Sequence, residues 1–208
     1  MIEFPRPMQA PERLYQPFSS DEWHFEIKMD GYRCMAGADA GEARLATKSG
    51  ADCTQWFAEV TEAIARLPGG PHIIDGEACV LDDDLGRSDF NRLQARARRR
   101  RRYPGCDRVT LVAFDLLVLD GRDVMGLPLV ERKALLRQLL AGVPKASVMY
   151  LGDLPAQAEL FDQVVVGLKL EGLMAKRLQS PYQPGVRSDD WRKIKRANWQ
   201  EGRIWRGR

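Results

Sequence analysis

The stretch Phe25-Glu26-Ile27-Lys28-Met29-Asp30-Gly31-Tyr32-Arg33 alternates apolar and charged residues up to a glycine. In an extended strand, successive side chains point to opposite faces, so Glu26, Lys28 and Asp30 share one face while the apolar residues pack behind them. Gly31 lets the chain turn directly afterwards. An amine between two carboxylates, backed by a core, suits a nucleophile. Taken alone, however, so short a pattern fits a half-buried strand with a solvated charged face better.

The composition is that of an ordinary globular protein, with 44% hydrophobic and 29% charged residues over 208 positions. This length allows one large domain or two small ones. No apolar run approaches the length of a membrane helix, and residues 1–20 lack the apolar core of a signal peptide. We therefore expect a cytoplasmic protein without a membrane partner.

The metal-binding side chains of zinc sites are sparse in this chain. Its cysteines are Cys34, Cys53, Cys79 and Cys106, and no two of them form a CxxC pair. The chain has only two histidines. A structural zinc site is therefore not expected. Reduced thiols in a reducing compartment are the simplest interpretation.

Positive charge is concentrated in two places, although the formal net charge is only +3. The first is a block of arginines, and the second is the tail 187–208. The block consists of Arg96, Arg98, Arg99, Arg100, Arg101 and Arg102. Such blocks are typical of proteins that bind polyanions, nucleic acid first among them. A solvated helix face or a disordered basic tail explains the same charges equally well.

The hydrophobic periodicity predicts more strands than helices, in irregular alternation. Strands are expected within 23–37 on either side of Gly31, and at 43–48, 73–81, 109–119, 148–152, 172–176 and 191–194. Helices are expected at 54–67, from Ser88 onward, and at 129–141 and 155–168. This pattern favours an α+β fold with mostly antiparallel sheets flanked by helices. Residues 1–20, rich in proline and polar residues, are expected to wrap the surface as irregular chain.

Several polar residues have predicted local roles. Asp52 or Thr54 is expected to cap the first helix, and Ser88 the second. Asp115 interrupts the most apolar strand, where a carboxylate without partners would be costly.

Five short stretches place charged or aromatic groups on strands that also carry core residues. They are the stretch around Lys28, Asp75-Gly76-Glu77, Ala113-Phe114-Asp115-Leu116-Leu117, Leu170-Glu171-Gly172-Leu173-Met174-Ala175-Lys176, and Trp191-Arg192-Lys193-Ile194-Lys195. Together they supply several lysines, carboxylates and an aromatic ring. This inventory suits a nucleoside triphosphate, because carboxylates hold Mg²⁺, cations neutralise phosphates and a ring stacks on a base.

With these five motifs in this order, the chain resembles the ATP-dependent DNA ligases, within the covalent nucleotidyltransferases that include RNA ligases and capping enzymes. It is most similar to the ligase domain of bacterial end-joining ligases. The likeness runs from Pro7-Met8-Gln9-Ala10 to Lys195. It implies that residues 1–208 form a single adenylation domain, a nucleotidyltransferase (ATP-grasp-like ligase core), with an irregular leader at 1–20 and a basic tail at 196–208.

The resemblance implies a role for each motif residue. Lys28 would attack the α-phosphate of ATP and form a lysyl-AMP. In the nucleotide-binding set, Glu26 would accept from the adenine amino group, Ile27 would touch the base and Phe114 would stack on the nucleotide. Arg33 and Lys48 would lie near the ribose and phosphates, and Lys193 and Lys195 would neutralise the α-phosphate. Glu77 and Glu171 complete the set. Glu77 and Glu171 would serve Mg²⁺ or Mn²⁺. Arg98, Arg99, Arg100, Arg101 and Arg102 would contact nucleic acid.

The chain departs from the family pattern in two respects. Lys48 stands where the family usually has Arg, which keeps the charge but loses the planar fork. The residues after Lys195 are too few for an OB-fold domain, so no such domain is expected within this sequence. The expected partner is nicked or broken double-stranded DNA, together with end-joining proteins or a separate OB-fold domain. An RNA ligase, a capping-type enzyme and a nucleic-acid-binding module with weak adenylation are the alternative interpretations.

Overall fold

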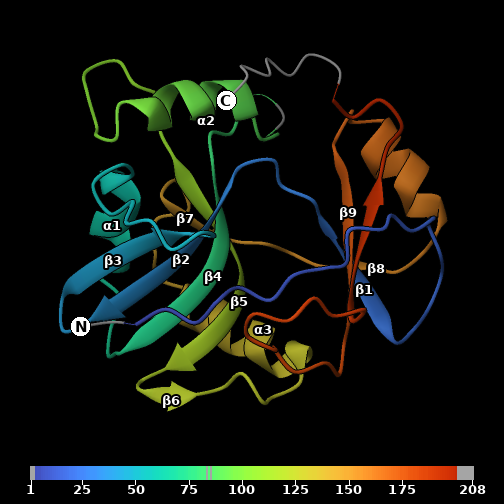
Figure 1. The fold of residues 1–208 in the computed structure, drawn as a ribbon, viewed down its shortest axis with the longest axis horizontal. Helices are drawn as coiled ribbons and strands as arrows, with labels where there is room; N and C mark the ends of the chain where they lie inside the picture. Colours follow the sequence, from blue (N-terminus) through green and yellow to red (C-terminus); the bar gives the residue numbers. More distant parts are fainter. Residues whose placement is uncertain (1–2, 83, 85, 201–208) are drawn as a thin grey trace.

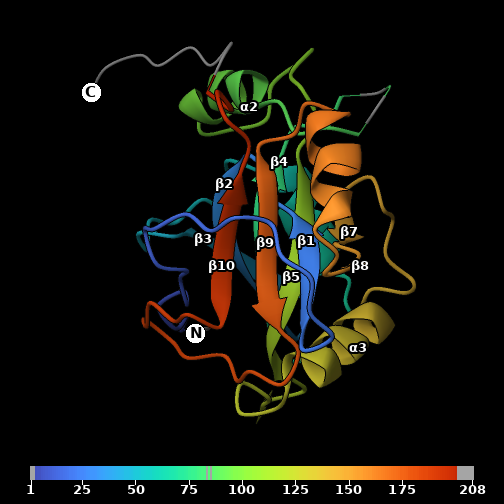
Figure 2. The ribbon, with the colours of Figure 1, turned by 90° about the vertical axis from the view of Figure 1, so that its right-hand side faces the viewer.

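Two β-sheets face each other, and the strand that leads to Lys28 belongs to the smaller one (Figure 1). The computed structural model describes residues 3–82, 84 and 86–200. The smaller sheet has four strands in the order β10-β9-β1-β8, all antiparallel. These are β1 (Trp23–Ile27), β8 (Leu154–Pro155), β9 (Gly172–Arg177) and β10 (Trp191–Lys195), seen side by side in Figure 2.

The larger sheet carries most of the remaining chain. Its strands are β2 (Tyr32–Asp39), β3 (Glu42–Thr47), β4 (His72–Cys79), β5 (Thr110–Leu119), β6 (Arg122–Asp123) and β7 (Val148–Tyr150). They follow the order β3-β2-β4-β5-β6, and β7 joins the β6 edge of β5 as a parallel neighbour. The predicted α+β class with mostly antiparallel sheets is thus confirmed.

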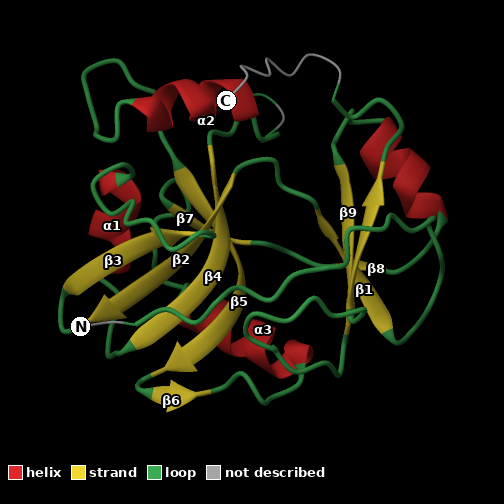
Figure 3. Ribbon diagram, viewed as in Figure 1, coloured by secondary structure: helices red, strands yellow, loops and turns green. Residues whose placement is uncertain are grey.

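Helices surround the two sheets, and α2 lies beyond the upper ends of the strands in the view of Figure 3. The helices α1 (Ala58–Ile64), α2 (Phe90–Arg98) and α3 (Leu129–Leu139) share one core with the larger sheet, through buried residues such as Val60, Leu93 and Leu136. The π-helix η1 (Phe161–Val166) packs Val165 against the outer face of the smaller sheet. A third core lies between the two sheets, where Phe114 and Trp191 meet edge to face.

Gly31 connects the two sheets directly after Lys28. β1 lies in the smaller sheet and β2 in the larger one, so the turn between them crosses the gap. A Cβ atom at Gly31 would collide with the carbonyl oxygen of Ala78 and the sulfur of Cys79. Glycine is required here because the backbones of two strands approach each other closely. As a result, Lys28 sits at the cleft between the sheets.

The predicted helices are longer than the observed ones, and two caps differ. Asp52 accepts from the backbone amide of Thr54 and closes a turn, so α1 begins four residues later than the predicted start. Ser88 accepts from the amide of Asp30 instead of capping α2, and Asp89 takes that role.

The helix predicted at 155–168 is also shorter than expected. Leu154 and Pro155 pair with β1 and form β8, so the helical turns begin at Glu159 and continue through η1. Pairing with a neighbouring strand therefore overrides the helical preference only at the start of this segment.

The leader is irregular as predicted but does not merely wrap the surface. Among the described residues of 1–20 no helix or strand forms, apart from isolated bridges at Gln9 and Leu14. Met8 is fully buried and Ala10 nearly so, in the core between the sheets. Of the predicted basic tail, 201–208 lies outside the described residues.

Asp115 has the partner that its burial demands. Arg132 of α3 contacts both of its carboxylate oxygens, with N–O distances of 2.8 and 3.0 Å, and both side chains are fully buried. All four cysteines are free thiols, as predicted. No helix within the described part of the chain is long and apolar enough to cross a membrane.

Candidate active site

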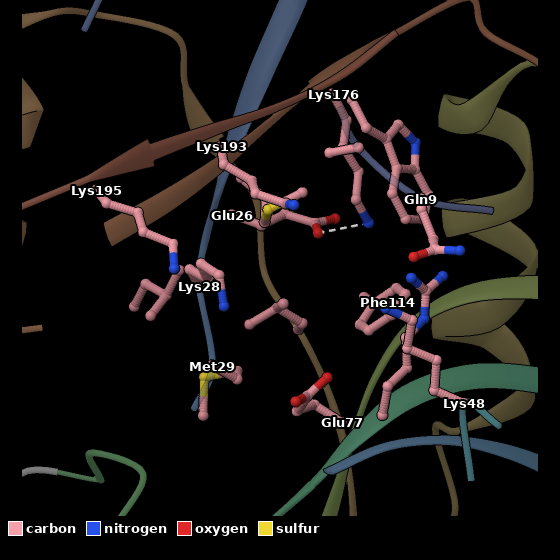
Figure 4. Close-up of a pocket in the computed structure, with 16 residues that line it drawn as sticks. Gln9, Glu26, Lys28, Met29, Lys48, Glu77, Phe114, Lys176, Lys193 and Lys195 are labelled. Carbon is pink, nitrogen blue, oxygen red and sulfur yellow. Dashed lines mark ion pairs between the residues drawn. The ribbon is translucent and has the colours of Figure 1, made fainter. Parts of the chain in front are cut away.

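A cavity of about 300 Å³ lies between the two sheets and is lined by residues from the leader and from both sheets (Figure 4). Of the ten residues predicted to bind nucleotide, nine line it, namely Glu26, Ile27, Lys28, Arg33, Lys48, Glu77, Phe114, Lys193 and Lys195. The tenth, Glu171, contacts Lys28 and Lys195 directly. Folding therefore gathers the five motifs at one place.

Lys28 follows β1, and both its backbone and its side chain contact the start of β9. Its amide donates to the carbonyl of Gly172 at 2.9 Å, and its Nζ lies 3.0 Å from Oε2 of Glu171. The other oxygen of Glu171 lies 2.8 Å from Nζ of Lys195. Glu171 is nearly buried, so it holds the two amines close together at a fixed separation.

Lys193 adds a third amine to this group, as the strand alternation of 191–195 predicts. Trp191, Lys193 and Lys195 all line the cavity, whereas Ile194 points the other way into a core. Burial, followed by the charges of Lys28 and Lys195, lowers the pKa of Lys193. Amines that repel one another in this way favour the arrival of an anion.

Arg33 is held rigidly against the cavity wall. Its Nε and Nη2 contact the two carboxylate oxygens of the fully buried Asp75 at 3.0 and 2.6 Å. Tyr182 donates to the same carboxylate at 2.7 Å and accepts from the amide of Met8. Because Asp75 already fixes this guanidinium, Arg33 offers a ligand only its remaining donors. Burial, followed by the charge of Arg33, lowers the pKa of nearby Lys48.

Glu77 is a carboxylate that lacks sufficient compensating charge. Burial raises its pKa to about 7, even though Lys28 and Arg33 act in the opposite direction. A divalent cation supplies the charge that such a carboxylate lacks, and carboxylate oxygens are the ligands that Mg²⁺ and Mn²⁺ prefer. Glu77 and Glu171 therefore fit a hard divalent cation. The described residues contain no group of three or more metal-binding side chains, so phosphate oxygens and water would complete its shell.

Aromatic and charged side chains meet at one wall of the cavity. Nζ of the buried Lys176 lies 4.3 Å from the ring centres of both Phe114 and Trp191. The same atom lies 2.6 Å from Oε2 of Glu26, as the dashed line in Figure 4 shows. Phe114 is thus at once a core residue and a cavity wall.

The arginine block lies outside the cavity, and one member differs from the rest. Arg96 is fully buried, contacts Glu59 at 3.3 Å and donates to the carbonyl of Arg101. Arg98, Arg99, Arg100, Arg101 and Arg102 are exposed. Among the described residues, none of those five forms an ion pair with a carboxylate.

The sequence pattern of the family described as "ATP dependent DNA ligase domain" matches residues 6–195. This chain belongs to that family. The match contains all five motifs and ends at Lys195, the last residue of β10.

Known proteins from several bacteria share this domain. The chain is 34% identical over 195 residues to the multifunctional non-homologous end joining protein LigD of Mycolicibacterium smegmatis, covering 94% of this chain and 24% of that protein. The corresponding protein of Mycobacterium tuberculosis is 37% identical with the same coverage. A solved mycobacterial DNA ligase D complexed with ATP and MES superposes with a TM-score of 0.77 at 34% identity, over 93% of this chain and 62% of that one. The chain thus spans about a quarter of the length of these LigD relatives.

Several residues of this ligase-family site escaped prediction. Trp191 shares a strand face with Lys193 and Lys195, so alternation placed it at the site although no role was assigned to it. Lys176 is five positions from Glu171, so alternation from that assigned residue would have put it on the opposite face. Tyr182 and Lys133 lie outside the five motifs. Lys133 follows Glu131 and Arg132 in an amphipathic helix, where a charged residue is usually solvated, and no local signal distinguishes it.

Proposed function

We propose that this domain transfers AMP from ATP to the 5′-phosphate of broken or nicked DNA, as a ligase in DNA repair. The observation that carries the proposal is the convergence of Lys28, Lys193 and Lys195 on one cavity, in a chain of the ATP-dependent DNA ligase family. Positioning and charge neutralisation are the main demands of phosphoryl transfer.

In the first step, the amine of Lys28 attacks the α-phosphorus of ATP. A nitrogen–phosphorus bond forms, the bond to the bridging oxygen breaks and pyrophosphate leaves. The amine must lose a proton, and Oε2 of Glu171, 3.0 Å away, is placed to accept it. Lys193 and Lys195 neutralise the α-phosphate. A divalent cation at Glu77 and Glu171 would stabilise charge on the phosphate oxygens.

In the later steps, the AMP on Lys28 passes to DNA. An oxygen of the 5′-phosphate attacks the same phosphorus, the bond to Lys28 breaks and the amine regains a proton. The oxygen of a 3′-hydroxyl then attacks the phosphorus of the 5′-phosphate and forms a phosphodiester bond. The anhydride bond to AMP breaks, AMP leaves, and the hydroxyl proton passes to solvent. Phe114 and Met174, which both line the cavity, would hold the adenine during these steps.

We further propose that the exposed residues Arg98–Arg102 track the phosphates of the DNA. The N-terminal end of α2, at Phe90, lines a second hollow, to which Lys28 also contributes. The helix rises about 1.5 Å per residue, so Arg98 lies about 12 Å beyond Phe90. That distance equals about three to four base pairs along a duplex. A duplex lying over α2 with its break at Lys28 would therefore bring its phosphates to the arginines.

The decisive experiment uses ATP labelled at the α- or the γ-phosphate, with Mg²⁺ and then with Mn²⁺. The protein should retain the α-label covalently and not the γ-label. Lys28→Ala should abolish the adduct, whereas the control Lys145→Ala, at an exposed lysine outside the cavity, should not. Absence of an adduct in the unaltered protein would refute the proposal.

The identity of the acceptor needs a separate assay. The labelled protein is mixed with nicked duplexes whose 3′ strand is DNA or RNA, with and without a 5′-phosphate. Transfer of AMP to the phosphorylated DNA nick is expected. Transfer only to the RNA-containing nick would favour the RNA ligase alternative.

A further inference from the structure

Glu26 forms a buried ionic cluster at the floor of the cavity. Its side chain is almost completely inaccessible to solvent, and each carboxylate oxygen meets a different lysine. Nζ of Lys133 lies 2.6 Å from Oε1, and Nζ of Lys176 lies 2.6 Å from Oε2. Nε2 of His24 lies 3.4 Å from Oε1. Each oxygen of the Glu26 carboxylate is therefore held by the ammonium group of a lysine.

Lys133 differs from Lys176 because it does not line the cavity. It comes from α3, behind Glu26, and its Nζ also donates to the carbonyl of Leu151 at 3.0 Å. Tyr150 presents its ring 4.8 Å from the same nitrogen. The adjacent Arg132 is anchored by Asp115, which fixes the backbone of α3 at this point. A ligand in the cavity therefore touches Glu26 and not Lys133.

The two lysines keep Glu26 ionised. Burial alone would raise the pKa of this carboxyl, but Lys133 and Lys176 together lower it well below its ordinary value. Each carboxylate oxygen can accept two hydrogen bonds. Lys133 and His24 occupy Oε1, whereas Oε2 meets Lys176 alone and keeps a free lone pair, in an orientation that the contact of Lys133 at the other oxygen helps to set.

We propose that Lys133 is a positioning residue for base selection, because it orients the Glu26 carboxylate toward a purine amino group from outside the cavity. This inference rests on the proposed function, in which Glu26 accepts from the amino group of adenine. The substrate class that it favours is a purine nucleotide with an exocyclic amino group at the position of the adenine amine. Inosine triphosphate carries a carbonyl oxygen there and repels a carboxylate.

The test compares covalent labelling by α-labelled ATP and α-labelled inosine triphosphate. Lys133→Met should raise KM for ATP and leave the maximal rate nearly unchanged, because the groups around Lys28 are untouched. The preference for ATP over inosine triphosphate should fall about tenfold or more, the value of one hydrogen bond to a charged acceptor. Lys133→Gln, which retains a donor, should recover part of the preference.

Arg137→Met is the matched control. Arg137 lies one turn further along α3, is exposed, and stacks on the ring of Tyr150, but it does not contact Glu26. Its replacement should leave the nucleotide preference unchanged. With Lys133→Met, ATP affinity should also weaken at acidic pH more than in the unaltered protein, because Glu26 then becomes protonated more readily.

The outcomes separate the two proposals. Labelling of the unaltered protein together with an unchanged ATP preference in folded Lys133→Met, or in Lys133→Ala if the first variant does not fold, would overturn the role of Lys133 alone. No labelling of the unaltered protein by either nucleotide would overturn both the proposed function and this inference. An equal loss of preference in Arg137→Met would show a general effect of α3 and would also overturn the role of Lys133.

Discussion

Glu77→Gln should increase the stability of the free protein while it removes a proposed metal ligand. Burial raises the pKa of Glu77 to about 7, from an ordinary value of 4.5. The folded protein therefore keeps this proton to a higher pH than the unfolded chain does. As pH rises from about 4.5 to about 7, the unfolded state releases the proton first, and the folded state loses stability.

The size of this loss can be bounded. The displacement from 4.5 to about 7 corresponds to about 3.4 kcal/mol at most. Glu77 is only half-buried by its surface exposure, so solvent screening reduces the expected value to about 1–2 kcal/mol. Glutamine has a similar shape and does not ionise, so Glu77→Gln should be more stable than the unaltered protein by that amount at pH 8, and by little at pH 4.5.

Chemical denaturation at intervals between pH 4.5 and pH 8.5 measures this difference, because other titrating groups cancel between the two proteins. The exposed Glu62 provides the control Glu62→Gln for the loss of one negative charge. Mg²⁺ or Mn²⁺ should stabilise the unaltered protein at pH 8 more than it stabilises Glu77→Gln, since a cation that binds only the folded state adds to its stability. A difference between the two proteins that is constant with pH would refute the reasoning about Glu77.

Three further predictions concern the frame and the DNA. Arg132→Met should lower the free energy of unfolding by about 3–5 kcal/mol, because it leaves the Asp115 carboxylate buried without its partner; denaturation of Arg132→Met together with Asp115→Leu should recover much of this loss. Gly31→Ala should cost about 1–3 kcal/mol in a denaturation experiment, because its Cβ collides with the carbonyl of Ala78, and an unchanged midpoint would contradict the close approach. Neutral residues at Arg98–Arg102 should weaken binding to duplex DNA and flatten its dependence on salt by about 0.9 in log–log slope per lost phosphate contact; an unchanged slope would place the DNA elsewhere.

The motif residues were predictable from the sequence because strand alternation is a local property. In Trp191-Arg192-Lys193-Ile194-Lys195, the period of two alone separates the residues that line the cavity from Ile194 in the core. The need of Asp115 for a partner was equally clear, since a buried charge demands one, but the identity of Arg132 was not. That partner comes from a helix 17 positions away along the chain.

Helix boundaries were less predictable, because side chains that could cap a helix found other partners. Serine is favoured at helix N-caps, yet the turn after Lys28 brings the amide of Asp30 to the hydroxyl of Ser88. Pro155, the first residue of the helix predicted at 155–168, pairs with β1 instead, and the helical turns begin at Glu159. In both cases a contact distant in sequence outweighed a local preference.

The sequence by itself determined the class of the fold, the five motifs and the chemistry of their side chains, because these follow from alternation, residue type and resemblance to a family. Only the tertiary structure decided which charged side chains of the motifs contact one another. It showed that Glu171 joins Lys28 to Lys195, that Asp75 occupies much of Arg33, and that Lys133 reaches Glu26 from behind. The physical reason is that distances between charges, and their burial, arise from the packing of two sheets and a helix, which no local stretch of sequence encodes.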